Sequence, residues 1–274
     1  MSDIALSAGV RSNLLQLQKT SDLITLTQTR LATGKRVNSA LDNPINFFTA
    51  QGLSNRASDL SNLLDSMSTG INTIEAANNG ITSITKLVQS AQALATQALQ
   101  TTDTAVRSDL ATQFGAILTQ IDQLAGDSGF NGINLLDSTN SGDLTVTLNE
   151  KGTSSVTIAA VDFTSGGDLG INGAANNWAL TANITAASTD LTAALTTLRS
   201  QSQSFGSSLS TVQIRQDFTK AMINTLQTGA DSLTLADSNE QGANLLALQT
   251  RQQLSTTALS LASQASQAVL RLFQ

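Results

Sequence analysis

The sequence predicts a mainly α-helical fold. Long coiled-coil helices from both chain ends are expected to pair antiparallel, with a small β-hairpin insertion in the middle. Two observations support this prediction. Apolar residues recur at alternating steps of three and four through most of both halves, which is the coiled-coil period. Helix breakers are scarce over the same stretches, and the 274 residues include a single Pro.

The first helix is expected within residues 4–32, which show this period with imperfect occupancy. Gly34 is suited to end it, because glycine readily adopts the left-handed conformation found after helix C-termini. Asn43 and Pro44 are suited to begin the next helix, since the fixed backbone angle of proline matches the first helical position. The predicted seam consists of Val10, Leu14, Leu17, Ile24 and Leu31, with polar Ser21 and Gln28 at two further positions.

The second helix is expected to run from Pro44 to about Gln100. The Asn-Asn-Gly stretch at residues 78–80 weakens the expectation that it is continuous. Asn78 and Thr85 occupy seam positions, where a polar residue typically sets the register of a coiled coil, so we assign them no chemical role. The apolar seam is Leu60, Leu64, Met67, Ile71, Ile74, Ile81 and Val88.

A third helix is expected after residues 101–105, closed by Gly126 and folded back on the second as an antiparallel hairpin. The period then changes. Residues 143–163 alternate apolar and polar side chains around Asn-Glu-Lys-Gly, which predicts a β-hairpin. Residues 164–177 are rich in Gly, Asn and Ser and indicate a loop. Trp178 is expected to pack against this insertion, an exposed adhesive role being the alternative.

Helical spacing returns near residue 188 and reaches Leu235, and residues 236–244 interrupt it. Asp237 and Glu240 in the interruption are expected to cap a helix rather than bind a metal, because one or two carboxylates do not form a coordination cage. The seam before the interruption is Leu191, Leu195, Leu198, Phe205, Leu209 and Val212. The seam of the final helix is Leu254, Ala258, Leu261, Ala265, Ala268 and Leu272, followed by Phe273.

Composition excludes several classes of function. The net charge is −6, and Lys and Arg are scattered, so the sequence lacks the basic footprint of a nucleic-acid binder or of a membrane-surface helix. It contains neither His nor Cys, which removes imidazole and thiolate chemistry and the usual zinc ligand sets. Composition leaves only carboxylate-based catalysis open, and we assign no catalytic, metal or cofactor residues. The first residues lack the pattern of a Sec-type signal peptide.

The two terminal helices have apolar seams and few charges. One partner helix covers one seam and leaves the rest of an apolar surface in water, which is typical of an interaction surface. We therefore expect the termini to pair with each other and then with copies of the chain, and a repeated heterologous contact produces an open filament. The alternative is that they are core helices of a monomeric bundle, since leucine stripes are usually core.

Three segments then identify a family. They are "RLATGKRVNSALDNP" at residues 30–44, "GFNGINLLD" at residues 129–137, and the C-terminal stretch from residue 235 to residue 273. Each resembles the corresponding stretch of bacterial flagellins. The short middle of the chain is similar to that of the short alphaproteobacterial type.

The resemblance implies a structural, non-enzymatic subunit that polymerises into the helical flagellar filament for swimming motility. It implies secretion by the flagellar type III export route to the extracellular flagellum. The implied partners are other flagellin subunits, an export chaperone at the C-terminal helix, and the filament cap and junction proteins. Residues 88–97 lack the Arg and Glu of the segment read by a Toll-like receptor in many flagellins, so weak recognition is expected.

The resemblance also implies a division of the chain. It comprises an N-terminal inner-core helix and spoke (1–43), N-terminal outer-core helices (44–137), a variable β insertion (138–187), a C-terminal outer-core helix (188–236) and a C-terminal inner-core helix (237–274). In the spoke, Lys35, Arg36 and Asn38 are either intersubunit contacts or members of an ordinary solvated loop.

Three other functions compete with that of a filament subunit. A hook–filament junction protein shares the terminal helices, and Asp-Asn-Pro at residues 42–44 favours it, whereas residues 129–137 favour a flagellin. A metallopeptidase in the insertion requires His-Glu-x-x-His, which a chain without His cannot supply. An adhesin in the insertion is disfavoured, because the short segment shows no ligand constellation.

Overall fold

The computed structural model describes residues 8–272, which form two compact units. One unit joins the two chain ends, up to Asn55 and from Thr225, and the other spans Arg56–Asn224. The fold is mainly α with a small two-stranded sheet, as predicted. Helices α2 (Pro44–Gln100) and α4 (Thr181–Thr234) contribute residues to both units.

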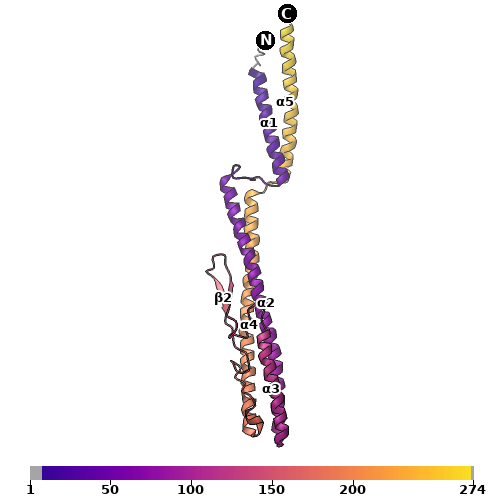
Figure 1. The fold of residues 1–274 in the computed structure, drawn as a ribbon. Coiled ribbons are helices and arrows are strands. Elements are labelled where there is room, and N and C mark those ends of the chain that lie inside the picture. Colours follow the sequence, from indigo (N-terminus) through magenta and orange to yellow (C-terminus); the bar gives the residue numbers. More distant parts are fainter. Residues whose placement is uncertain (1–7, 273–274) are drawn as a thin grey trace. The chain divides into compact units, whose positions relative to one another are not determined.

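In the terminal unit, α1 (Ala8–Thr33) and α5 (Ser238–Leu272) lie side by side and antiparallel (Figure 1). Gly34 ends α1 with a φ of 68°, the left-handed conformation expected of it. Its carbonyl accepts a hydrogen bond from the Ala236 amide (3.0 Å), and Lys35 forms an isolated β-bridge with Leu235. The chain segments that leave α1 and enter α5 are therefore joined through their backbones.

The ends of α2 and α5 in this unit are capped by side chains. The Asn43 side chain accepts from the Asn46 amide (3.0 Å) just before Pro44, so the predicted start of α2 is confirmed. The Asp237 carboxylate accepts from the amides of Asn239 (2.8 Å) and Glu240 (3.3 Å). Asp237 is thus a helix cap, as expected, but the break is shorter than residues 236–244, because α5 begins at Ser238.

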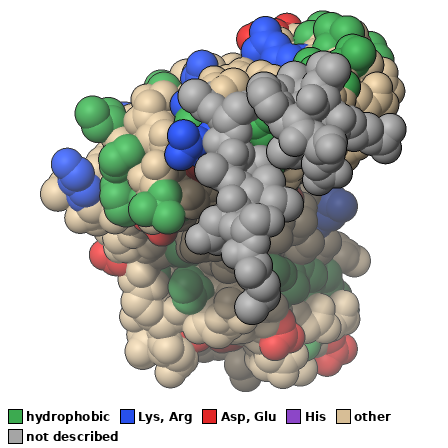
Figure 2. Space-filling view, turned by 90° about the horizontal axis from the view of Figure 1, so that it is seen from above, with side chains coloured by type: hydrophobic (Ala, Val, Ile, Leu, Met, Phe, Trp, Pro, Cys, Tyr) green, Lys and Arg blue, Asp and Glu red, His purple; other side chains and the backbone are tan. Residues whose placement is uncertain are grey.

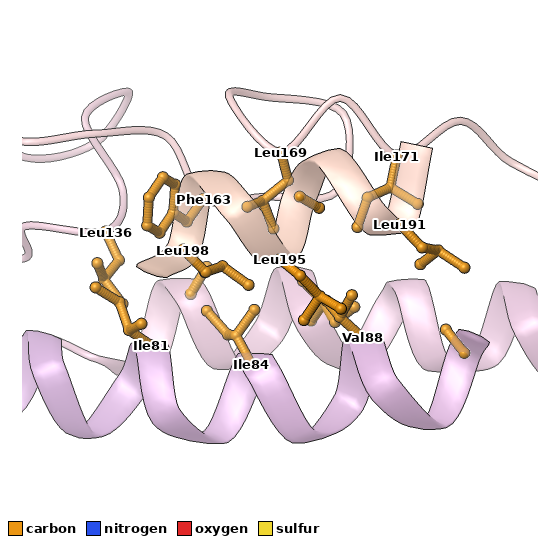
Figure 3. Close-up of a cluster of buried hydrophobic side chains, with 14 of the residues drawn as sticks. Ile81, Ile84, Val88, Leu136, Phe163, Leu169, Ile171, Leu191, Leu195 and Leu198 are labelled. Atoms are coloured by element: carbon orange, nitrogen blue, oxygen red, sulfur yellow. The ribbon is translucent and has the colours of Figure 1, made fainter. Parts of the chain in front are cut away.

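The second unit contains the main hydrophobic core, formed by α2, α3 (Thr104–Asp127), α4 and the insertion. Figure 3 shows apolar side chains from α2, the insertion and α4 meeting between the helices. Residues that are almost fully buried include Met67, Ile74, Phe114, Ile121, Leu136, Phe163, Leu191 and Phe205. The seams predicted for α2 and α4 therefore face this core.

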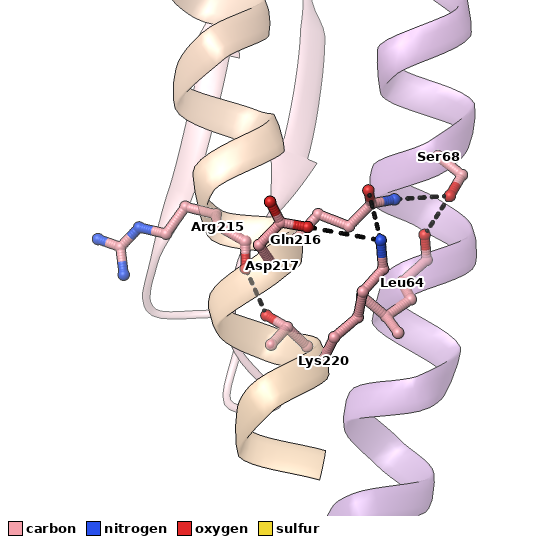
Figure 4. A network of polar contacts seen from close by, with 7 residues as sticks. Leu64, Ser68, Arg215, Gln216, Asp217 and Lys220 are labelled. Carbon is pink, nitrogen blue, oxygen red and sulfur yellow. Dashed lines mark hydrogen bonds and ion pairs between the residues drawn. The ribbon is translucent and has the colours of Figure 1, made fainter. Parts of the chain in front are cut away.

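Polar contacts fix the register of α2 against α4. The Ser202 hydroxyl donates to Asn78 Oδ1 (2.8 Å), which places Asn78 in the register role expected of it. Nearer the other end of the unit, Gln216 donates to the Ser68 hydroxyl (2.9 Å), and that hydroxyl donates to the Leu64 carbonyl (2.8 Å), as Figure 4 shows. Thr85 instead donates to the Ile81 carbonyl of its own helix (2.7 Å) and forms no such bridge.

The Asn-Asn-Gly stretch does not interrupt α2, so the expected weakness at residues 78–80 was wrong. Gly80 has a packing reason to be glycine. A Cβ atom there would overlap the Ser128 side chain and lie 2.7 Å from Leu136 Cδ1. The absence of a side chain lets the segment after α3 lie directly on α2, and the packing gained offsets the poor helix propensity of glycine.

The insertion contains the predicted β-hairpin, with shorter strands than the alternating pattern suggested. β1 (Leu144–Thr147) pairs antiparallel with β2 (Ser155–Ile158), and Val146 lies opposite Val156. A two-stranded sheet is at best marginally stable alone, so it needs a surface to pack on. Val146 supplies that contact, because a Cβ on Gly70 of α2 would lie 2.6 Å from its Cγ2 atom.

Trp178 is buried in the same apolar cluster as residues of the insertion, which excludes the exposed adhesive alternative. It ends a short 3₁₀ helix, η1 (Ala175–Trp178), and its ring also packs on Phe114 of α3 with ring centroids 4.9 Å apart. The prediction did not include this contact with α3. Helix α4 starts at Thr181, seven residues before the expected position, because Ile184 and Ala187 extend the buried seam beyond the leucine pattern.

Arg107 is a buried charge that ties three helix ends together. Its Nε donates to the carbonyls of Ala98 (3.2 Å) and Thr101 (2.8 Å), at the end of α2. Its Nη1 donates to the Ala179 carbonyl (3.4 Å) and its Nη2 to the Thr181 hydroxyl (3.2 Å), at the start of α4. At the C-terminus of α2 the cation satisfies carbonyls that helix geometry leaves unpaired, and the dipole of that helix favours positive charge there.

We expect Arg107→Ala to lower the free energy of unfolding by about 2–3 kcal/mol, because it leaves buried carbonyls without a donor. Urea unfolding of the monomer followed by circular dichroism measures the change. The control is Arg215→Ala, whose exposed side chain points away from α2 in Figure 4 and which should shift stability by less than about 0.5 kcal/mol. Equal effects of the two variants would contradict the role assigned to Arg107.

We expect two glycine substitutions within helices to have opposite signs. Gly80→Ala should destabilise the monomer by about 1–3 kcal/mol, because the added methyl overlaps Ser128 and Leu136. Gly206→Ala in α4 meets nothing within 4 Å and should stabilise by about 0.5–1 kcal/mol through helix propensity. The same urea unfolding experiment measures both, and stabilisation by Gly80→Ala would show that this contact is not tight.

Candidate assembly surface of the terminal helices

The face of α1 that is shielded from solvent follows the heptad period. The prediction placed Val10, Leu17, Ile24 and Leu31 on it, and all four are half-buried. The polar positions were assigned wrongly, since Ser21 and Gln28 are exposed and their neighbours are buried instead. Leu14 is 39% exposed and lies at the edge of the seam. The shielded residues of α1 are Val10, Asn13, Leu17, Thr20, Ile24, Thr27, Arg30 and Leu31.

Two threonines on this face can be buried without leaving a hydroxyl group unpaired. The Thr20 hydroxyl donates to the Gln16 carbonyl (2.9 Å) and the Thr27 hydroxyl donates to the Leu23 carbonyl (2.7 Å). Each hydroxyl is therefore satisfied within α1 and needs no partner on α5. The methyl group of each threonine remains available for packing against the neighbouring helix.

On α5 the shielded face is not the one predicted. Leu254 is 68% exposed and Leu261 is 62% exposed, and Ala258, Ala265 and Ala268 are also exposed. Leu272 is the last residue of α5 and its side chain is not described, and Phe273 lies outside the described residues. The half-buried positions are Leu245, Leu248, Gln252, Ser255, Leu259 and Ala262.

Both sets on α5 follow steps of three and four, so spacing alone could not choose between them. Gln252 and Ser255 made the set that is shielded look less apolar than the set that is exposed. The helix therefore carries two stripes: one is shielded and the other, which contains the predicted seam, is open to solvent.

Exposed leucines also occur on α1. Leu15, Leu23 and Leu26 fall within one broad stripe of the helix surface, and so do the exposed leucines of α5. Several large apolar side chains left exposed along one side of a helix indicate an interaction surface in a soluble protein. We call this set the outer stripe, and it consists of Leu15, Leu23, Leu26, Leu246, Leu254 and Leu261.

The side chains of Lys35, Arg36 and Asn38 are exposed in the loop between α1 and α2. The backbone of this loop is held in place. The amides of Arg36 (2.7 Å) and Val37 (3.2 Å) donate to the Thr234 carbonyl, and the Asn38 side chain donates to the Lys35 carbonyl (3.2 Å). The structure brings these side chains to one fixed loop but gives none of them an ion pair among the described residues.

Asp42 closes the same loop. Its carboxylate accepts hydrogen bonds from the amides of Ser39 (2.9 Å) and Asn38 (3.0 Å), which hold its pKa below the usual range. The turn displays an apolar patch that sequence reasoning missed, namely Leu41, which is 96% exposed, Ile45 and Phe48. Their steps of four and three were a readable signal, but they lie at a helix start where no seam was expected.

The described residues form no candidate metal centre and no membrane-spanning helix. In the end-on view of Figure 2, Lys, Arg, Asp and Glu side chains are scattered and form no single charged patch. Within residues 8–272, no group of three His, Cys, Asp or Glu side chains is arranged to hold a metal ion. No helix of the described part is long and apolar enough to cross a membrane.

Comparisons with known proteins identify the family of the chain. The family model for the bacterial flagellin N-terminal helical region matches residues 8–141, and the model for the C-terminal helical region matches residues 188–273. The flagellins FljM and FljO of Caulobacter vibrioides are each 31% identical over 275 aligned residues, covering 100% of this chain and 99% of theirs.

A flagellin of Brucella melitensis is 24% identical and covers 100% of both chains. Among solved structures, the crystal structure of Bacillus cereus flagellin has a TM-score of 0.48 at 24% identity, over 58% of this chain and 88% of that chain. Because family models match both helical regions and relatives align along the entire length, the chain belongs to the bacterial flagellin family.

Proposed function

We propose that the chain polymerises by burying the outer stripe of α1 and α5 against the same helices of other copies. As a flagellin, the chain is a structural subunit of the helical filament that bacteria use for swimming. The observation that carries the proposal is the exposure of Leu254 and Leu261 on a helix whose other apolar face is already shielded. An ordinary core helix would leave no second stripe in water.

The energetics favour association. Removing a leucine side chain from water contributes about 1.5–3 kcal/mol, and the outer stripe contains six leucines. Charge opposes burial little, because Asp22 is the only acidic residue between residues 8 and 33, and Glu240 the only one between 238 and 272. When each copy offers one surface and receives another, the contact is heterologous and grows into an open filament.

The segments expected from the sequence take roles in this proposal. Residues 1–43 and 237–274 form the inner core, residues 44–137 and 188–236 form the outer core, and residues 138–187 face outward. Lys35, Arg36 and Asn38 contact neighbouring subunits through the fixed loop that displays them. The full-length similarity to flagellins favours this function over that of a hook–filament junction protein.

The same proposal covers location and partners. The family is one of structural proteins, and we assign the chain no enzymatic activity. It acts outside the cell, after export, in the flagellum. An export chaperone binds α5 before export, because the open apolar stripe of that helix needs cover in the monomer. Cap and junction proteins receive the same terminal helices at the two ends of the filament.

The segment at residues 88–97 should make the protein a weak agonist of the Toll-like receptor that reads flagellins. Its exposed side chains are Gln89, Ser90, Ala93, Thr96 and Gln97, so it offers the receptor no charged anchor. A reporter-cell assay against a flagellin that carries Arg in this segment measures the difference at equal protein concentration. Stimulation as strong as that of the comparison flagellin would contradict the prediction.

We expect the double variant Leu254→Ser, Leu261→Ser to stop the growth of sheared filament seeds, as seen by electron microscopy. The loss of two buried leucines should raise the critical concentration by at least about tenfold, since each contributes more than about 1.5 kcal/mol. Removal of residues 259–274 should have the same effect. The monomer should keep its helix content by circular dichroism, because both leucines are exposed in it.

The matched control is Leu180→Ser, which changes a leucine of similar exposure (59%) just before α4. This variant should elongate seeds as the unmodified chain does. If the double variant also elongates them at the unmodified concentration, the outer stripe is not a polymer contact.

A further inference from the structure

A pocket of about 310 Å³ lies between α1 and α5, and it has an unusual lining for a site between two coiled-coil helices. Two arginines face it, Arg30 from α1 and Arg251 from α5. Two amide side chains lie beside them, Gln241 and Asn244, and the rim includes Leu23 and Leu26. No acidic residue lines the pocket, so two positive charges share it without a counterion from the chain.

Arg30 has an unmet need for a partner. Its Nε atom is buried and has no hydrogen-bond partner among the described residues. Gln241 beside it is only 6% exposed. A buried cationic donor without an acceptor is costly, and native structures normally supply an acceptor to such groups. The pocket is therefore already formed in the monomer, but it lacks a negatively charged group to pair with its two arginines.

The acidic groups of the same chain do not meet this need. Asp42 is the carboxylate on which Arg30 acts electrostatically, but it does not line the pocket. The lowered pKa of Asp42 comes first from the Ser39 and Asn38 amides and only last from the charge of Arg30. Within the described part of the chain, neither Arg30 nor Arg251 belongs to an ion pair.

We propose that this pocket binds one carboxylate of a second copy of the chain, held between Arg30 and Arg251. The inference rests on the proposed function and names a polar contact within that assembly. The planar guanidinium group matches the two oxygens of a carboxylate, which favours a paired acceptor over a single point charge. The amide groups of Gln241 and Asn244 are available for the remaining lone pairs.

The position of the pocket identifies its occupant as another copy rather than a free anion. Leu23 and Leu26, which line it, are 45% and 36% exposed and belong to the outer stripe. Because these leucines belong to the lining, a surface that covers the outer stripe here also covers part of the pocket. Covering the pocket excludes water and strengthens the attraction between the buried charges.

The chain itself limits the choice of donor. Asp22 is the only acidic residue between residues 8 and 33, it is exposed, and it is adjacent to Leu23 of the outer stripe. When two outer stripes pack together, Asp22 of one copy is carried onto the surface of the other. Glu240 is the only acidic residue between 238 and 272, and it is the second candidate carboxylate in the experiments below.

The first experiment measures the critical concentration for elongating sheared filament seeds with Arg251→Gln. Arg251 is exposed, so the monomer should fold normally, and circular dichroism checks this. The critical concentration should rise about tenfold, as expected when one partner of a desolvated charge pair is removed. Arg215→Gln removes the same charge from an exposed site on α4 and should leave the critical concentration within about twofold of the unmodified value.

The second experiment exchanges the charges. Asp22→Arg and Arg251→Asp should each impair elongation, and the two changes in one chain should recover part of it, because the new cation of one copy then meets the new carboxylate of the other, while Arg30 stays in the pocket and limits the recovery. The same set is made with Glu240→Arg. If neither double variant recovers while Arg251→Gln is impaired, the assignment of the donor to the terminal helices is overturned.

The third experiment separates a free anion from a second copy, using calorimetric titration of the monomer with inorganic phosphate. We expect no saturable binding at millimolar phosphate. Phosphate binding that Arg251→Gln abolishes, together with unchanged elongation by that variant, would make the pocket a free-anion site and overturn the proposal. If the unmodified chain elongates seeds and Arg251→Gln does so equally, only the pocket proposal fails. If the unmodified chain does not elongate them, the proposed function fails as well.

Discussion

One helix cannot shield two apolar faces of its neighbour, and this geometric limit governs the terminal unit. Helix α5 has leucines on two sides, and α1 accounts for one of them. Within this unit α1 is the helix that packs along α5, and a monomer could remove the second face from water only with a further helix packed there. The surface left over is therefore a property of the fold, and association with further copies completes it.

The other unit resolves the same problem internally. Its three helices and the insertion surround a common core, in which Gly80 and Arg107 permit a close approach of chain segments and the pairing of helix ends. Apolar area is buried there without help from another molecule. The chain thus combines a unit with its own hydrophobic core and a terminal unit that leaves an apolar surface exposed. Local unfolding is expected to need less free energy in the terminal unit, because it has fewer buried apolar residues.

Much of the fold could be predicted from the sequence because two periods dominate it. Steps of three and four located the helices, alternation located the hairpin, and Gly34 with Pro44 located the break between α1 and α2. The choice of face on α5 could not be predicted, because Ser, Gln and Ala serve in a seam as well as between seams. The contact between Trp178 and Phe114 could not be predicted either, since the two residues are distant in sequence and no local pattern links them.

The sequence predicted that the terminal helices carry an apolar interaction surface, but it did not predict which residues of that surface face α1 and which face solvent. Spacing selected Leu254 and Leu261, and these are open to solvent, although they were expected to form the seam toward the other terminal helix as well. The arginine pocket left no sequence signal, because Arg30 and Arg251 come together only when α1 and α5 pair. A site formed by residues from two helices that are distant in sequence can be recognised in the folded structure but not from the sequence alone.

The threonines of α1 have a mechanical consequence. Thr20 and Thr27 direct their hydroxyls to the backbone of their own helix, so they present methyl groups to the space between helices. Apolar contacts are not directional, and their free energy changes gradually as two surfaces slide. Under a pulling or bending load, such an interface yields by small axial slip instead of by rupture of a bond. The α1–α5 pair of one subunit can therefore adjust its axial register under load without breaking a hydrogen bond of these threonines.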